Sequence, residues 1–160
     1  MLVTLERRGT VAVISLNDAT RRNALSVGIL SGVLNALTES RRDGMRAVVL
    51  ASTQTAFCAG ADIREMLDSG WLEAGPRDGG APPTPLDLFA ALEAETRPVL
   101  AAVDGLALGG GVELVLSCDM ALAGTKASFA LPEIGLGVIP NTAMARLPGL
   151  MAAAPPWSSS

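Results

Sequence analysis

The hydrophobic pattern of the N-terminal third changes between the period typical of strands and the period typical of helices. Two β-rich runs within residues 1–16 predict a hairpin that turns at Gly9. From Ser26, which is suited to an N-cap, apolar residues recur at helical spacing until Gly44 ends the helix. The short apolar run 47–50 then predicts a buried strand.

Two later stretches share one layout, a strand followed by a small-residue turn and a helix start. In Phe57–Met66 the turn is at Gly60, and Asp62 suits a helix N-terminus by its charge and its capping ability. In the second stretch the apolar run 99–103 reads as a buried strand, and three glycines at 109–111 open an apolar helix.

The remaining segments continue this strand–helix rhythm, which indicates one α/β domain over residues 1–150. Residues 151–160 end in Pro-Pro-Trp-Ser-Ser-Ser, and we expect them to be a disordered tail. The other predicted elements are a loop at 69–85, a helix at 86–96, strands at 119–123 and 127–131, a turn at 132–137 and a helix beginning at 141–147.

Composition excludes several classes of partner. The net charge of −4 argues against a nucleic-acid partner, which requires clustered Lys and Arg, and 49% hydrophobic residues suffice for a large core. We expect no membrane span, since the best apolar stretch, 99–115, is broken by Asp104, several glycines and Glu113. Two separated cysteines in apolar contexts and no signal peptide at the N-terminus indicate a cytoplasmic protein.

The absence of histidine and tyrosine narrows the possible chemistry. Ser-His-Asp and Cys-His machinery and His-ligated metals are excluded, so we expect no metal site. Acid–base chemistry must then come from carboxylates, Cys, Lys or backbone dipoles.

Glu113 is the only charge in the apolar helix that follows the three glycines. A carboxylate there costs free energy unless it is paired, hydrogen-bonded or protonated. Because glycines bare the backbone at the helix start, N–H groups can face a ligand directly. The spacing fits neither a P-loop nor a dinucleotide fingerprint. This stretch is therefore predicted to hold half of an oxyanion site and one acid–base carboxylate.

Five stretches in order resemble the crotonase (enoyl-CoA hydratase/isomerase) family. The resemblance extends from about residue 3 to residue 150. It implies a spiral of repeated strand–strand–helix units, with acyl-CoA thioesters as substrates. The five stretches are Asn23–Ser26, Phe57–Ile63, Asp104–Glu113, Ser117–Asp119 and Phe129–Gly137.

By the same resemblance, the backbone N–H groups of Ala61 and Gly110 would hold the thioester oxygen. Two preorganised donors in a dry site stabilise the enolate charge that develops on that oxygen. Arg21, Arg22 or Arg64 would be candidates for the phosphates of CoA. Further residues implied in substrate binding are Ala24, Ala59, Ala61, Asp62, Ile63, Gly109, Gly110 and Pro132.

The resemblance also implies two catalytic carboxylates, with Glu113 as the base that orients a water and Glu133 as the acid that protonates Cα. Two carboxylates in different protonation states can perform hydration, so no cofactor is expected beyond the CoA of the substrate. The expected function is enoyl-CoA hydratase. Enoyl-CoA isomerase and an inactive acyl-CoA-binding remnant are the alternatives.

Other interpretations of these residues stay open from the sequence. Glu113 can instead be a helix carboxylate paired with Arg97 or Lys126, and Glu133 can be an exposed turn residue. Ala61 can be a packing residue, and the cysteines read as core thiols.

The sequence departs from the family pattern near its end. Residues 141–147 lack the usual glycines after Pro140 and are one residue shorter, which leaves the choice between hydratase and isomerase open. The chain also lacks the family's C-terminal helices, so we expect a truncated or frame-shifted product. The homotrimer typical of the family is therefore doubtful here.

Overall fold

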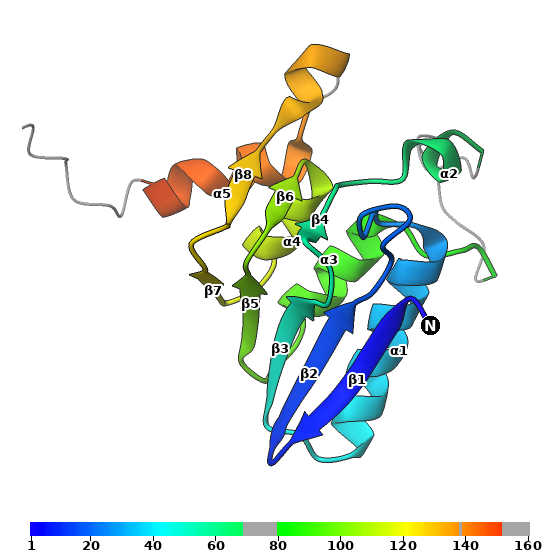
Figure 1. Cartoon of the computed structure of the whole chain (residues 1–160), viewed down its shortest axis with the longest axis vertical. Coiled ribbons are helices and arrows are strands. Elements are labelled where there is room, and N and C mark those ends of the chain that lie inside the picture. The colour runs from blue at the N-terminus through cyan, green and yellow to red at the C-terminus, as the bar shows by residue number, and fades with distance from the viewer. Residues whose placement is uncertain (69–79, 138, 152–160) are drawn as a thin grey trace, which may run out of the picture.

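The computed structural model describes residues 1–68, 80–137 and 139–151 (Figure 1). Its strands are β1 Val3–Arg8, β2 Val11–Leu16, β3 Ala47–Ser52, β4 Ala56–Cys58, β5 Val99–Val103, β6 Leu106–Leu108, β7 Met120–Ala123 and β8 Ser128–Ala130. Its helices are α1 Val27–Arg42, α2 Ile63–Asp68, α3 Pro85–Glu93, α4 Gly110–Leu116, the 3-10 helix η1 Pro132–Leu136 and α5 Asn141–Met151.

The strands form two sheets. The larger has the order β1-β2-β3-β5-β7, in which the β1–β2 hairpin is antiparallel and every other pair is parallel. The smaller has the order β4-β6-β8, and both of its pairs are parallel. The predicted N-terminal hairpin is confirmed.

From β3 onward, successive strands go alternately to the two sheets, which gives the expected spiral. β3, β5 and β7 each contribute to the large sheet, and the next strand in each case, β4, β6 and β8, joins the small one. A helical segment then returns the chain to the next turn. The expected spiral of strand–strand–helix turns is therefore confirmed for the described residues (Figure 1).

The core lies between the large sheet and the helices α1 and α3, which run behind it in Figure 1. Alternate residues of β2 show the pattern, because Ala12, Ile14 and Leu16 are buried while the residues between them are half-buried. Ile29, Leu30 and Val33 of α1 are fully buried against this face.

Helix boundaries follow the predicted signals. Ser26 is the N-cap of α1, and its side chain accepts a hydrogen bond from the Ile29 N–H. Gly44 follows the helix with a φ of +68°, a conformation that glycine adopts without cost. Thr84 and Asp87 form a capping box at the start of α3.

Some predictions differ from the structure or lie outside it. The turn expected at 132–137 is largely the 3-10 helix η1, and α3 starts at Pro85 and ends at Glu93. Most of the loop expected at 69–85 lies outside the described residues, as does the tail except Met151, which ends α5. Among the described helices, none is both long and apolar enough to cross a bilayer.

A nearly buried carboxylate ties the connection between α3 and β5 to α1. The Glu95 side chain, which is 1% exposed, accepts hydrogen bonds from Arg97 at 2.6 Å and from Arg41 at 2.9 Å. Arg97 also reaches the hydroxyl of Ser40 at 3.1 Å. The Arg97 hydrogen bonds hold the pKa of Glu95 at about 2, below its ordinary 4.5, and Arg41 adds to this effect.

The edge strand β7 exposes apolar side chains. Met120 is 55% exposed and Leu122 is 65% exposed. They share one face of the strand, since they are two residues apart. Within the described ranges β7 pairs on one side only, with β5, so its outer backbone groups and these side chains face solvent.

We predict that the Glu95 ion pairs make stability depend on pH. A carboxyl whose pKa is lowered in the folded protein adds its full stabilisation at any pH above the pKa of the unfolded chain. For Glu95 this stabilisation is lost as the pH falls from about 4.5 to about 2. Glu95→Gln should lower the free energy of unfolding by about 2–3 kcal/mol at pH 7. Urea titrations at pH 7, 4 and 3 measure it, with the exposed Glu39→Gln as control. A gap between wild type and Glu95→Gln that is as wide at pH 3 as at pH 7 would contradict the assignment.

We also predict that β7 causes self-association of this chain. Leu122→Lys should reduce association because a charge on an edge strand opposes strand pairing and apolar contact. Leu86→Lys is the matched control, since Leu86 on α3 is also 65% exposed. Sedimentation velocity over a range of concentrations gives the measurement. A wild-type chain that remains monomeric throughout would refute the prediction.

Candidate active site

Two corners rich in glycine and alanine follow the parallel strands β4 and β6. Because parallel neighbours end at the same edge of a sheet, residues 59–61 and 109–111 meet there (Figure 1). A Cβ atom added to Gly110 would lie 3.3 Å from the Ala61 nitrogen, and one added to Gly60 would lie 3.6 Å from the Gly110 nitrogen. The two corners are therefore in backbone contact.

This contact depends on glycine at specific positions. A Cβ atom on Gly111 would overlap the carbonyl oxygen of Cys58. Gly60 and Gly109 have φ values of +99° and +49°, which side chains disfavour. The glycines therefore allow the start of α4 to lie directly against the end of β4.

The N–H groups of Ala61 and Gly110 are both available at this corner. The Leu25 N–H donates to the Gly60 carbonyl at 2.7 Å, and the Leu25 carbonyl accepts from the Asp62 N–H at 3.5 Å. In this parallel bridge the N–H of Ala61, the residue between them, points away from Leu25. Gly110 is the first residue of α4, so its N–H has no acceptor within the helix. In the part of the chain that the structure describes, neither amide donates a hydrogen bond to the protein.

Glu133 reaches the same corner from the third strand of the small sheet. The Gly109 N–H donates to the Ala130 carbonyl at 2.9 Å, and η1 begins two residues later. A Cβ atom on Gly109 would overlap Oε1 of Glu133, so the carboxyl occupies the space that this glycine leaves open.

One carboxylate oxygen of Glu133 is buried without a hydrogen-bond partner among the described residues. Such an atom is costly and calls for an explanation, of which a catalytic role is one. The alternative of an exposed turn carboxylate is wrong, because Oε2 is shielded from solvent.

Glu113 lies one turn into α4 and is held by the neighbouring helix. Its Oε1 accepts a hydrogen bond from the Ala143 N–H at 3.2 Å, near the N-terminus of α5, and its side chain is half-buried. The alternative pairing with Arg97 is wrong, since Arg97 binds Glu95, and Lys126 is an exposed residue of the β7–β8 connection.

The residues expected to bind the substrate line one edge around these groups. Ala24 is nearly buried, and its segment runs beside 59–62 through hydrogen bonds from Ala59 N–H to Arg22 carbonyl at 3.1 Å and from Leu25 N–H to Gly60 carbonyl. Ala59 and Asp62 are half-buried, whereas Ile63, Arg64 and Pro132 are exposed.

The three arginines proposed for the phosphates are placed differently. Arg22 and Arg64 are exposed and form no ion pair with any described residue. Arg21 instead binds two carboxylates, Asp62 at 2.9 Å and Glu65 at 2.6 Å. The structure thus commits Arg21 to the protein.

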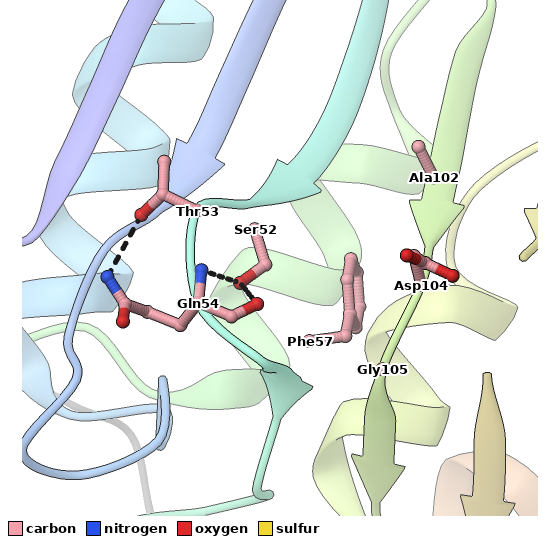
Figure 2. A pocket seen from close by; sticks show the side chains of 7 residues that line it. All are labelled: Ser52, Thr53, Gln54, Phe57, Ala102, Asp104 and Gly105. Atoms are coloured by element: carbon pink, nitrogen blue, oxygen red, sulfur yellow. Dashed lines mark hydrogen bonds between the residues drawn. The ribbon is translucent and has the colours of Figure 1, made fainter. Parts of the chain in front are cut away.

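A shallow hollow lies at the other end of β4 and β6 (Figure 2). The three residues of each strand separate it from the amide pair by about 10 Å. The Ser52 hydroxyl in its wall already accepts from the Gln54 N–H and donates to the Ala56 carbonyl. No predicted site residue lines the hollow, whose walls are Ser52, Thr53, Gln54, Phe57, Ala102, Asp104 and Gly105.

Asn23 supports the site in a way the sequence analysis missed. It is fully buried at a φ of +57°, and its amide nitrogen donates to the Ala56 and Phe57 carbonyls at 3.0 and 3.1 Å. It therefore holds β4 next to the segment that leads to Leu25. The signal in the sequence is an Asn beside an apolar pair, because Asn tolerates left-handed backbone.

The two cysteines take no part in the site chemistry. Burial raises the pKa of the Cys58 thiol to about 12, and burial does the same for Cys118. Both are therefore protonated core thiols, as the sequence indicated.

Comparison with known proteins gives one consistent result. A model of the enoyl-CoA hydratase/isomerase family matches residues 6–150. The chain is 38% identical over 139 residues to a probable mitochondrial enoyl-CoA hydratase of Dictyostelium discoideum, covering 86% of this chain and 48% of that protein. It is 39% identical over 141 residues to a short-chain-enoyl-CoA hydratase of Clostridium acetobutylicum, covering 87% and 52%.

Solved structures agree with this result. The enoyl-CoA hydratase of Bacillus anthracis superposes with a TM-score of 0.77 at 33% identity, over 94% of this chain and 58% of that one. Pseudomonas aeruginosa AtuE gives a TM-score of 0.76 at 32% identity, over 92% and 57%. The chain spans about half the length of the curated relatives it matches.

We predict that Gly109→Ala disturbs the corner through Glu133. The added methyl group overlaps the Glu133 carboxyl, and the positive φ adds strain of about 1–3 kcal/mol. Gly137→Ala is the matched control, since Gly137 has a φ of +69° but nothing within 4 Å of an added Cβ. Thermal unfolding of both variants should show the larger loss for Gly109→Ala.

A double-mutant cycle isolates the contact. In a Glu133→Ala background the excess cost of Gly109→Ala over Gly137→Ala should disappear, because the overlapping group is gone. If the excess persists there, the carboxyl does not occupy the space beside Gly109.

Proposed function

Because the chain belongs to the enoyl-CoA hydratase/isomerase family, we propose that it adds water across the double bond of a 2-enoyl-CoA thioester. The observation that carries the proposal is the pair of amides of Ala61 and Gly110, which are in contact at one corner and donate to no group among the described residues. Two such donors, fixed by the backbone and needing no rearrangement, are what a developing oxyanion requires.

The proposed role of these amides is to hold the thioester oxygen. Addition of water at Cβ moves negative charge onto that oxygen, as an enolate forms. Hydrogen bonds from Ala61 and Gly110 strengthen as the charge grows, and one such donor typically contributes about 2.7–4 kcal/mol to lowering the barrier. The nearly buried surroundings at Ala24 and Gly110 favour this effect, because a low dielectric strengthens charge–dipole attraction.

The two glutamates divide the proton transfers. Glu113 accepts a proton from the attacking water, and Glu133 donates a proton to Cα, so that H and OH are added overall. The position of Glu133 over Gly109, beside the Gly110 amide, supports its role near Cα. Glu113 lies one turn further into the helix that Gly110 begins, which supports a role for it on the same substrate.

The CoA portion of the substrate lies in this proposal along the edge formed by Ala24, Ala59 and Asp62, with Ile63 and Arg64 further out. Small side chains at the first two positions leave the backbone accessible to an extended pantetheine chain. Acid, base and oxyanion donors are all protein groups, so the proposed reaction requires no metal or redox cofactor.

A second candidate is enoyl-CoA isomerisation. It needs the oxyanion site but only one carboxylate to move a proton between two carbons. The hydrogen bond that ties Glu113 to α5 favours it, since this contact occupies one oxygen of the base that hydration would use. The buried oxygen of Glu133 would then carry the proton alone.

We predict that Glu113→Gln and Glu133→Gln each lower hydration of crotonyl-CoA by roughly 10²–10⁴-fold in kcat, because each removes a proton-transfer group. Loss of enoyl-thioester absorbance reports the reaction. Exposed Glu93→Gln is the control for expression and folding.

The outcomes separate the candidates. An isomerase converts a 3-enoyl to a 2-enoyl thioester and loses that activity mainly with Glu133→Gln. Binding of crotonyl-CoA by calorimetry without turnover of either substrate would identify an inactive acyl-CoA-binding remnant and refute the proposed catalysis.

A further inference from the structure

An ion-pair bridge joins the segment before α1 to the start of α2. Arg21 donates from one guanidinium nitrogen to Asp62 Oδ2 at 2.9 Å and to Glu65 Oε1 at 2.6 Å. The Arg21 side chain is 49% exposed, whereas that of Asp62 is only 11% exposed. The bridge therefore lies at the surface, with its acidic end turned inward.

The two carboxylates also bind backbone on both helices. The second oxygen of Glu65 accepts from the Val27 N–H at 2.6 Å, at the first residue of α1. The second oxygen of Asp62 accepts from the Arg64 and Glu65 N–H groups at 3.1 and 3.2 Å, which caps α2. The bridge thus fixes the N-terminus of α2 against the N-terminus of α1.

The amide of Ala61 lies between these anchors. Its N–H belongs to the same planar peptide unit as the Gly60 carbonyl, which accepts from the Leu25 N–H at 2.7 Å. The direction of the Ala61 N–H is therefore set on one side by Leu25 and on the other by Asp62, which Arg21 holds. A shift of Asp62 would rotate the peptide unit that points at the site.

The Arg21 guanidinium already binds two carboxylates. Hydrogen bonds from its guanidinium, first to Glu65 and then to Asp62, raise the pKa of Arg21 above its ordinary value. A phosphate bound by Arg21 would compete with both carboxylates, whereas Arg22 next to it is exposed and has no ion pair with any described residue.

We propose that Arg21 is a positioning residue, which acts through Asp62 and Glu65 to orient the Ala61 N–H toward the thioester oxygen, and that it does not bind the phosphates of CoA. The inference rests on the proposed function, since it concerns the oxyanion donor. It also leaves Arg22 and Arg64 as the phosphate candidates among the three arginines that the resemblance suggested.

The kinetic test compares Arg21→Gln with the matched control Arg8→Gln, which removes another exposed, ion-paired arginine, on two substrates. These are crotonyl-CoA and crotonyl-pantetheine, which lacks the phosphates. A positioning role predicts a fall in kcat of at least about tenfold on both substrates for Arg21→Gln, with KM little changed, because a small misplacement of a catalytic group is costly. Arg21→Lys, which keeps the charge, should recover part of kcat. A phosphate role predicts instead a raised KM on crotonyl-CoA only, which would overturn the proposal.

A second readout does not require turnover. The Leu25 and Asp62 amides report the bridge around Ala61, and their hydrogen exchange should become roughly tenfold faster in Arg21→Gln and stay unchanged in Arg8→Gln. If wild type shows no turnover, the proposed function fails while this comparison still tests the bridge. Unchanged exchange in Arg21→Gln overturns the positioning role.

Discussion

The structure depends on one close approach, that of the α4 N-terminus to the end of β4. Gly111 leaves no room for a Cβ beside the Cys58 carbonyl, and Gly110 lies against Ala61. Since the packing is backbone against backbone, few side-chain substitutions can compensate for a change there. The small sheet, the amide pair and the position of Glu133 all depend on this contact, because each belongs to β4, β6 or β8 or to the residues that follow these strands.

Local chemistry explains why much of the fold was predictable. The Ser26 N-cap, the stop at Gly44 and the N-terminal hairpin are set by neighbouring residues, and all were predicted. The spiral and the pairing of the two small-residue corners came from the family resemblance. Nothing local distinguishes a strand that joins the large sheet from one that joins the small sheet, because both are short apolar runs.

The site was predictable in its backbone and less so in its side chains. The glycines at 60 and 110 predicted accessible backbone N–H groups, whereas the partners of charged residues depend on distant segments. Arg21 binds carboxylates 41 and 44 positions along the chain, and Glu113 accepts from an amide 30 positions away. Sequence spacing does not encode such contacts, so the partners of these charged side chains were the features that the pattern left open.

The alternation of strands between two sheets has a consequence for how the chain acquires its structure. Each parallel strand of the large sheet adds beside one formed earlier in the sequence, β3 on β2, β5 on β3 and β7 on β5. The register of each of these three strands is therefore set by a strand that precedes it in the sequence. The architecture can therefore grow in the direction of ribosomal synthesis, with every finished coil serving as the template for the one that follows.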